Sequence, residues 1–304
     1  MKSLALIESP LQLICAMEAV KHLSLSNIDF ALRKNLNNKN NEQLLNTAHF
    51  YNIKYNTFFS PYETSSPSAA IKSTAQLLKY LIPSYDKVIL GSYYSKLQRI
   101  VKSFIRAKNI HYVDDGVATY LAHQNITKNY YGPSFITIFK DLQSKNSLKV
   151  EHISLQLLRS RATALVKPEL VAIFIGQKLI QTNQLTKKDY FDTIIAATQG
   201  QRHLLYVAHR GEDEATLSEI LALNNITIIK PNLPLEIFLI ENNLKPVEIY
   251  SNTSTALFTL AEIFDAPLTY VIAATYKKPP PHLQAILSGL TFAYRKKPQN
   301  LIFQ

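Results

Sequence analysis

The stretch His111-Tyr-Val-Asp-Asp-Gly116 combines the end of a short apolar strand with two adjacent carboxylates and a glycine. The glycine lets the backbone turn sharply after the strand. Ligands and catalytic groups gather at the strand ends of α/β folds, because the rigid sheet directs them into a crevice. A carboxylate fixed there is suited to a general base that removes a proton from a hydroxyl group. The same residues are also typical of a solvated turn, so this stretch alone leaves both interpretations open.

Strand-like and helix-like segments alternate on both sides of this stretch. We expect strands at residues 3–7, 53–59, 87–90, 110–113, 170–175, 204–207, 226–229, 247–250 and 268–272. We expect helices at residues 11–23, 44–51, 69–81, 212–223, 235–241 and 254–264, a helix from residue 96 to 108, and a short one opened by the capping pattern of residues 186–189. The asparagine-rich residues 35–42 and the Pro/Ser/Thr-rich residues 61–67 are predicted to be loops.

Repeated strand–helix units predict parallel sheets covered by helices. The alternation dissolves between residues 125 and 166, so we predict a domain boundary there and assign residues 1–160 and 161–304 to two domains. The fold class is therefore α/β, with two Rossmann-like domains expected to face each other across a cleft.

The composition limits the classes of function. With 304 residues, 47% of them hydrophobic, the chain can bury a real core. A net charge of +11 suits nucleic acid, an anionic membrane surface or an acidic substrate. The basic residues are scattered and aromatic residues do not interleave with them, so we do not expect nucleic acid as the partner. No apolar run reaches the ~18 residues that span a bilayer, so we expect a cytoplasmic protein.

Cysteine and glycine are both scarce. Cys15 is the only cysteine, which excludes an intrachain disulfide and a cysteine-based zinc site, and the sequence shows no obvious metal-binding cluster. The 7 glycines form neither a Walker loop nor a GxGxxG fingerprint. A bound nucleotide must therefore be held by side chains and helix N-termini.

Two further stretches place polar side chains directly after a predicted strand. His209 follows the strand at 204–207, where an imidazole can contact phosphate or donate a proton, and Arg210 beside it adds a second anion-binding group. Ser254 and Thr255 follow the strand at 247–250 and lie near a helix N-terminus, where backbone N–H groups favour an anion. Ordinary capping of a turn or a helix would explain the same residues.

An acidic pair with glycine, a later histidine and a Ser-Thr pair resemble the three motifs of bacterial sialyltransferases. The closest similarity is to the lipooligosaccharide sialyltransferase family, which is related to the bacterial polysialyltransferases. Further segments that resemble this family are Ser9-Pro-Leu-Gln12, Gly91-Ser-Tyr-Tyr-Ser95, Phe174-Ile-Gly-Gln177, Pro234-Leu-Glu236 and Ser254-Thr-Ala-Leu-Phe258. The chain departs from the family where Arg210 replaces a proline, which leaves the orientation of His209 and the donor sugar open.

The resemblance implies a GT-B glycosyltransferase with a CMP-activated nonulosonic acid, such as sialic acid, as donor. The acceptor would be a glycan hydroxyl, free or lipid-linked, in surface polysaccharide or lipooligosaccharide synthesis. Transfer would invert the anomeric carbon without a metal or other cofactor. The 1–160 domain would bind the acceptor and the 161–304 domain the CMP-sugar.

The resemblance also implies roles for individual residues. Asp115 would be the base, with Asp114 and Gly116 supporting it, and His209 the acid or phosphate stabiliser. The donor side would comprise Gly176, Gln177, Arg210, Glu236 at the ribose, and Ser254 and Thr255 at the phosphate. The acceptor side would comprise Ser9, Pro10, Gln12, Ser92 and Tyr93.

Alternative functions remain at this stage. A nucleotide-sugar epimerase or a non-catalytic CMP-sugar-binding protein would use the same fold, and a basic membrane-binding or nucleic-acid-binding module would use the same charge. One charge cluster would suit peripheral contact with the anionic inner face of the cytoplasmic membrane, and a solvated charged face would also explain it. It comprises Lys277, Lys278, Arg295, Lys296 and Lys297.

Overall fold

The structure, a computed structural model, describes residues 2–64, 66–125, 134–145, 148–198, 203–252, 254–264 and the backbone of 268–271. The chain divides into two compact units, one of Met1–Ser154 with Asn232–Pro234 and one of Leu155–Pro231 with the residues from Leu235 onward. The sequence placed the boundary after residue 160, inside a helix, whereas the division falls after Ser154 and leaves that helix whole in the second unit.

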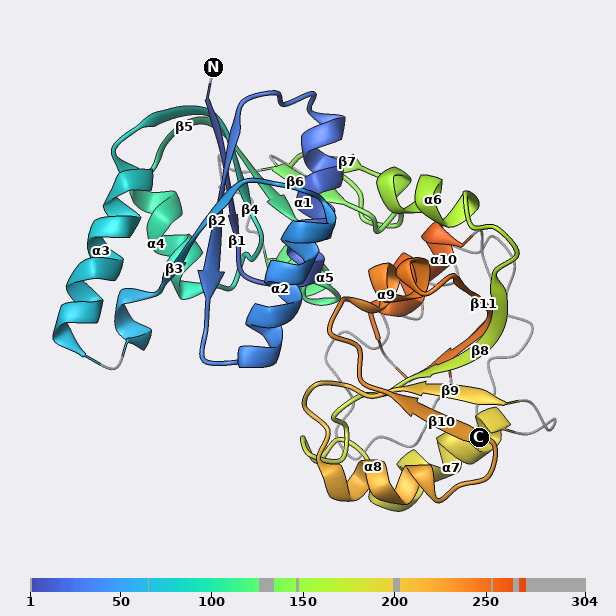
Figure 1. The fold of residues 1–304 in the computed structure, drawn as a ribbon. Coiled ribbons are helices and arrows are strands. Elements are labelled where there is room, and N and C mark those ends of the chain that lie inside the picture. Colours follow the sequence, from blue (N-terminus) through green and yellow to red (C-terminus); the bar gives the residue numbers. More distant parts are fainter. Residues whose placement is uncertain are drawn as a thin grey trace. The chain divides into compact units, whose positions relative to one another are not determined.

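The first unit is a seven-stranded parallel sheet in the order β3-β2-β1-β4-β5-β6-β7 (Figure 1). Its strands are β1 (Ser3–Ile7), β2 (Ile28–Lys34), β3 (Tyr55–Phe59), β4 (Ser84–Leu90), β5 (Arg106–Val113), β6 (Ser134–Thr137) and β7 (Val150–His152). Its helices are α1 (Pro10–His22), α2 (Asn38–Phe50), α3 (Pro67–Leu81), α4 (Lys96–Phe104), α5 (Ala118–Asn125) and the 3-10 helix η1 (Pro61–Glu63).

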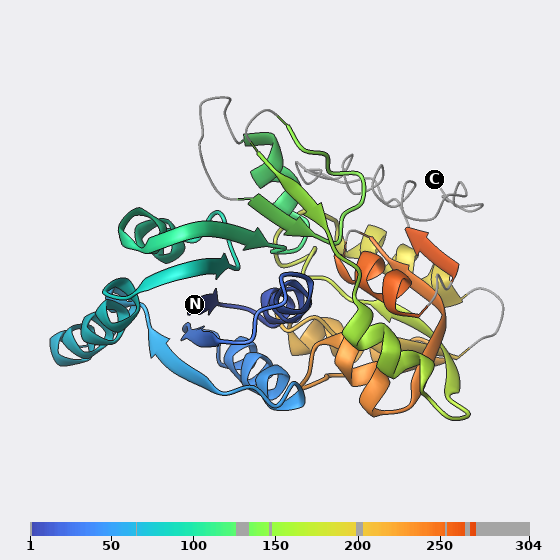
Figure 2. The same ribbon diagram turned by 90° about the horizontal axis from the view of Figure 1, so that it is seen from above.

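Both faces of this sheet are covered, which is why all five residues of β1 are apolar or small and buried. Leu4 and Leu6 of β1 share one hydrophobic core with the inner sides of α3 and α4. The helices α1 and α2 contact each other on the opposite side of the sheet (Figures 1 and 2).

The second unit repeats the same plan with five parallel strands in the order β10-β9-β8-β11-β12. Its strands are β8 (Glu169–Ile175), β9 (Leu204–Val207), β10 (Ile226–Ile229), β11 (Leu244–Ser251) and β12 (Leu268–Val271). Its helices are α6 (Gln156–Thr163), α7 (Lys187–Thr198), α8 (Glu214–Leu221), α9 (Leu235–Glu241) and α10 (Ala256–Ile263). The helices α7 and α8 share a core with β8 and β9, while α6, α9 and α10 pack together.

The prediction that residues 35–42 form an exposed loop was wrong. The helix α2 begins at Asn38, because the side chain of Asn37 caps it by accepting a hydrogen bond from the backbone N–H of Asn40 (3.0 Å). Asn40 is buried and donates from Nδ2 to the carbonyl oxygen of Glu8 (3.0 Å). Satisfied hydrogen bonds allow these amides to leave solvent.

Several other elements differ from the predicted ones. The helix expected to reach residue 108 ends at Phe104, because Ile105 is extended and β5 pairs with β4 from Arg106 onward. The strand β2 was not predicted, since its central apolar run is short and charged residues flank it. Between residues 125 and 166, where the pattern dissolves, the structure has the short elements β6, β7 and α6. By contrast, β1, β9, β10 and α9 have the predicted bounds.

Within the ranges given above, no helix has both the length and the apolarity to span a bilayer. The basic residues at 277, 278 and 295–297 lie outside the described residues.

Candidate functional site

In each unit, polar residues follow the strands at the point where the strand order reverses. The reversal lies between β1 and β4 in the first unit and between β8 and β11 in the second. In open parallel sheets, ligands bind beyond the carboxyl ends of the strands at such a point. In the first unit Glu8 and Ser92 follow β1 and β4 at the reversal, and Asp115 follows the adjacent β5. In the second unit Gly176 follows β8 at the reversal, and His209 follows the adjacent β9.

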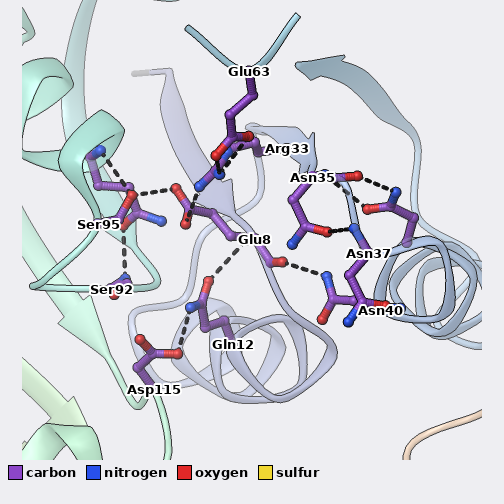
Figure 3. Close-up of polar contacts among 12 residues, drawn as sticks. Glu8, Gln12, Arg33, Asn35, Asn37, Asn40, Glu63, Ser92, Ser95 and Asp115 are labelled. Atoms are coloured by element: carbon purple, nitrogen blue, oxygen red, sulfur yellow. Dashed lines mark hydrogen bonds and ion pairs between the residues drawn. The ribbon is translucent and has the colours of Figure 1, made fainter. Parts of the chain in front are cut away.

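In the first unit, Gln12 connects the end of β1 to the end of β5 (Figure 3). Its Oε1 accepts the backbone N–H of Glu8 (2.9 Å), and its Nε2 donates to Oδ1 of Asp115 (2.7 Å). The Glu8 N–H fixes which end of the amide is oxygen, so the NH₂ group necessarily faces the carboxylate. Asp115 is half-buried, and its Oδ2 has no hydrogen-bond partner within the described part of the chain.

Gly91, at the carboxyl end of β4, is required by the position of Gln12. A Cβ added to Gly91 would lie 2.0 Å from Oε1 of Gln12, which is far inside van der Waals contact. The side chain of Gln12 is itself buried and held at both ends of its amide. Gly91 therefore leaves room for the side chain of Gln12, which links the ends of β1 and β5.

Glu8 anchors a second group of contacts around Arg33 (Figure 3). The guanidinium of Arg33 pairs with Oε2 of Glu8 (2.7 Å) and with the carboxylate of Glu63 (2.6 and 2.8 Å). Ser95 donates to Oε1 of Glu8 (2.7 Å) and also caps α4 by accepting from the backbone N–H of Gln98. Hydrogen bonds to fixed partners on β2, η1 and α4 therefore make the end of β1 rigid.

The two carboxylates of the acidic pair have different environments. Asp114 is fully buried, and its oxygens accept from Thr137 Oγ1 (2.7 Å) and from the backbone N–H of Ile138 (2.8 Å). Burial raises the pKa of Asp114 to about 7, and the neighbouring charge of Asp115 adds to the increase. Asp114 therefore ties β5 to β6, whereas Asp115 is the carboxylate of the pair that remains partly exposed. Gly116 follows in the left-handed region (φ 65°), as the turn requires.

The remaining residues expected on the acceptor side mostly support helices. Ser9 caps α1 by accepting from the backbone N–H of Gln12 (3.4 Å), and Pro10 is the first residue of that helix. Ser92 is buried and its backbone N–H donates to Gln98 (2.8 Å). Tyr93 packs edge-on against Tyr112 (ring centroids 5.6 Å apart).

In the second unit, the buried carboxylate of Glu212 lies beside the ends of β8 and β9. Its Oε1 accepts from the hydroxyls of Tyr206 (2.5 Å) and Tyr190 (3.2 Å), and its Oε2 accepts from the backbone N–H of His209 (2.6 Å). The Tyr190 hydroxyl also accepts from the backbone N–H of Gln177 (2.8 Å). Gly176 is needed beside this group, because a Cβ there would lie 2.5 Å from Glu212 and 2.6 Å from Tyr206. Burial raises the pKa of Glu212, although the donated hydrogen bonds oppose this effect.

His209 is held as a neutral imidazole in a defined tautomer. Burial, with the positive charges of Arg210 and Lys178, lowers its pKa to about 4. Its Nδ1 accepts the backbone N–H of Gly211 (2.9 Å), so the ring proton of the neutral form lies on Nε2. The side chain is half-buried and can present this N–H to a ligand. Arg210 is exposed beside it.

The other residues expected on the donor side have two kinds of position. Ser254 and Thr255 are half-buried at the N-terminus of α10, where Ser254 Oγ accepts from the backbone N–H of Ala256 (3.2 Å). Gln177 accepts from Ser251 Oγ (3.4 Å) at the ends of β8 and β11. Glu236 is buried and accepts a hydrogen bond from Thr259, which ties α9 to α10. In this structure its carboxylate is engaged within the protein, and burial raises its pKa.

The sequence did not identify the groups that organise these residues. Glu8, Arg33, Glu63, Tyr190, Tyr206 and Glu212 received no functional role, although Glu8 directly follows the predicted strand at 3–7. Among the residues that the structure describes, no three His, Cys, Asp or Glu side chains are grouped as a metal site.

No family model matches the sequence, and no curated protein matches it. Solved structures match over nearly the whole chain. The α/β-galactoside α-2,3-sialyltransferase of Photobacterium phosphoreum has a TM-score of 0.53 at 12% identity and covers 96% of this chain and 95% of its own. The UDP-GlcNAc 2-epimerase of Neisseria meningitidis, solved with UDP-GlcNAc, has a TM-score of 0.58 at 14% identity, with 99% and 96% covered. The Escherichia coli heptosyltransferase WaaC, solved with ADP, has a TM-score of 0.53 at 11% identity, with 92% and 89% covered.

The chain has the GT-B fold. This fold is shared by glycosyltransferases and by epimerases. At such low identities the likeness establishes the fold alone, and the function must be argued from the residues at the strand ends.

Asp114 should make the stability of the protein depend on pH. A carboxyl whose folded pKa lies near 7 and whose unfolded pKa lies near 4 stabilises the folded state below pH 4 and loses that contribution as pH rises to 7. We expect the free energy of unfolding of wild type to fall relative to Asp114→Asn across this interval, by up to about 4 kcal/mol. Urea unfolding of both proteins between pH 4 and 8 measures the difference. A constant difference across that range would contradict a buried, protonated Asp114.

Gly91→Ala should destabilise the protein by about 1–3 kcal/mol, because its Cβ collides with Gln12. In the Gln12→Ala background the same substitution should cost much less, since the colliding atoms are gone. Urea unfolding of the four proteins of this double-mutant cycle gives the coupling energy. If Gly91→Ala costs the same in both backgrounds, the glycine serves another purpose.

Proposed function

We propose that this protein is an inverting, metal-independent glycosyltransferase. It transfers sialic acid or a related nonulosonic acid from a CMP-activated donor to a glycan hydroxyl. The observation that carries the proposal is the environment of Asp115, a half-buried carboxylate at a strand end whose Oδ1 is held by Gln12. Its Oδ2, which lacks a partner among the described residues, supplies the lone pair that a general base needs.

The chemistry assigned to the first unit is activation of the acceptor. Asp115 accepts the proton of the acceptor hydroxyl as that oxygen attacks the anomeric carbon of the donor sugar. The bond between the anomeric carbon and the phosphate oxygen breaks on the opposite face, which inverts the configuration. Gln12 keeps the carboxylate oriented through Oδ1, and Asp114 is buried away from the substrate.

The chemistry assigned to the second unit is stabilisation of the leaving CMP. The Nε2–H of His209 donates a hydrogen bond to the phosphate, and negative charge developing there raises the tendency of the imidazole to take up a proton. The positive end of the α10 dipole, with the hydroxyls of Ser254 and Thr255, favours the same anion. Arg210 adds a full positive charge close to His209.

The overall charge supports an anionic donor. CMP-sialic acid has a phosphate and a carboxylate, and a protein with a net charge of +11 attracts such a molecule at long range. The glycan acceptor would belong to surface polysaccharide or lipooligosaccharide synthesis, free or attached to lipid.

A nucleotide-sugar 2-epimerase is the second candidate. The structure described as MnaA with UDP has a TM-score of 0.59 and that of the UDP-GlcNAc 2-epimerase a TM-score of 0.58, both above the 0.53 of the sialyltransferase.

One experiment separates the two candidates. The purified protein is incubated with CMP-sialic acid or with UDP-GlcNAc, each with and without a glycan acceptor, and the products are identified by mass and chromatography. We expect CMP release that requires the acceptor. Conversion of UDP-GlcNAc without an acceptor would establish the epimerase, and binding of CMP-sialic acid without turnover a non-catalytic protein.

Asp115→Asn should lower kcat by about 10²–10⁴-fold while leaving the Kd of CMP unchanged, because the base acts on the acceptor. Asp86→Asn is the matched control, since Asp86 lies near the opposite, amino-terminal end of β4 and pairs with Lys108. Turnover and calorimetric CMP binding are measured for both variants. A loss below tenfold in Asp115→Asn would remove the residue from the role of base.

His209→Ala should weaken CMP binding and lower kcat together, because the phosphate loses a donor in both the ground and the transition state. His209→Gln should retain more of both, since its amide N–H reaches the position of Nε2. Isothermal titration of each protein with CMP and with cytidine, which lacks the phosphate, isolates the contribution of the phosphate contact to the binding free energy. Equal losses for CMP and cytidine would show that His209 only closes the turn after β9.

A further inference from the structure

The helices α3 and α4 of the first unit expose large apolar side chains to solvent. Ile71 and Leu78 of α3 and Ile82, its C-cap residue with helical backbone angles, are spaced by seven and four residues, so they form one stripe. Ile100 and Phe104 are four residues apart on α4. Ile71, Ile82 and Phe104 are 72%, 71% and 68% exposed. Large apolar side chains gathered in this way usually mark an interaction surface.

The stripe is not required for the core. The buried side chains of α3, Leu77 and Tyr80, are on the side of the helix opposite to Ile71 and Ile82. The buried side chains of α4 are Leu97 and Val101, whereas Phe104, the last residue of α4, is exposed. Both helices lie against the same face of the sheet (Figures 1 and 2). Their exposed sides therefore belong to one surface of the first unit, which we call the α3–α4 surface.

The charges on this surface have a single sign. Neither α3 nor α4 contains an aspartate or a glutamate, and their basic residues are Lys72, Lys79, Lys96, Arg99 and Lys102. Lys79 adjoins Leu78 and Arg99 adjoins Ile100, so positive charge borders the apolar side chains. Within the described part of the chain, Lys72, Lys79 and Arg99 form no ion pair.

We propose that the α3–α4 surface docks the protein on an anionic lipid bilayer. Basic side chains approach the lipid phosphates, and the neighbouring isoleucine and phenylalanine side chains enter the headgroup boundary. Charge favours this occupant over a second copy of the chain, because two such surfaces facing each other would repel. The inference is independent of the proposed function, since it uses no residue at the strand ends.

The test is co-sedimentation of the full-length protein with phosphatidylcholine vesicles, with and without phosphatidylglycerol, at low and high salt. The basic variant combines Lys72→Gln, Lys79→Gln and Arg99→Gln. The apolar variant combines Ile71→Ser, Ile82→Ser and Phe104→Ser. A control that removes the same charge from exposed positions elsewhere combines Lys54→Gln, Lys145→Gln and Lys245→Gln. Melting temperatures confirm that all variants are folded.

Wild type should bind only the anionic vesicles, and high salt should release it. The basic variant should lose at least about tenfold in partition coefficient, because each basic residue near the surface contributes several-fold. The apolar variant should weaken binding at low salt as well, whereas the control should bind nearly as wild type.

Three outcomes would overturn the proposal. One is equal binding to neutral and anionic vesicles. Another is loss of binding when the five basic residues at 277–278 and 295–297 become glutamine, with no effect of the basic variant. The third is a dimer in sedimentation velocity that the apolar variant dissociates without any change in vesicle binding, which would assign the surface to a second copy.

Discussion

Parallel pairing of one central strand on both of its sides is the constraint on which each unit depends. The strand β1 pairs with β2 and with β4, and β8 pairs with β9 and with β11. Because the strands are parallel, all carboxyl ends meet at one edge of the sheet, and helices lead away from the reversal point in opposite directions. The polar residues after these strands are therefore concentrated at one edge instead of being distributed over the surface.

The two units organise that edge in the same physical way. In the first, Gln12 accepts a backbone N–H and reaches the end of another strand. In the second, Glu212 accepts hydrogen bonds from Tyr206 of β9 and from the backbone N–H of His209, and it lies against Gly176 at the end of β8. Each of these side chains packs against a glycine, Gln12 against Gly91 and Glu212 against Gly176. A Cβ at either glycine would collide with the polar side chain. A chain with only 7 glycines thus places two of them where a polar side chain lies against the end of a strand.

The basic residues of the first unit have two kinds of environment. Arg33 is enclosed by Glu8 and Glu63, which keeps the end of β1 fixed, whereas α3 and α4 expose basic residues without any acidic partner on the same helices. Buried ion pairs of this kind require complete hydrogen bonding to offset desolvation, so they restrict the geometry more than they stabilise the fold. The exposed charges are free of that requirement and can act on partners.

The sequence by itself determined the class of fold and most elements whose apolar pattern is strong. The strands β9 and β10 and the helix α9 have the predicted bounds, because buried side chains at regular spacing specify them locally. It also placed carboxylates, a histidine and hydroxyls at strand ends. It failed at Asn40, whose burial depends on a hydrogen bond to the distant Glu8, and after Phe104, where pairing with β4 overrides the helical pattern.

Only the tertiary structure decided which polar groups act together. Gln12 and Asp115 are separated by 103 residues in sequence, and no local pattern relates them until β1, β4 and β5 are neighbours. The same is true of Asp114 and Thr137, whose contact buries one carboxylate of the pair and leaves the other accessible. The apolar periodicity that predicts a helix or a strand is a local feature of the sequence, whereas hydrogen-bond partners at a sheet edge depend on strand order. The sequence therefore predicted which polar residues lie at the strand ends, whereas the order of the strands in the sheet determines which of them form hydrogen bonds with each other.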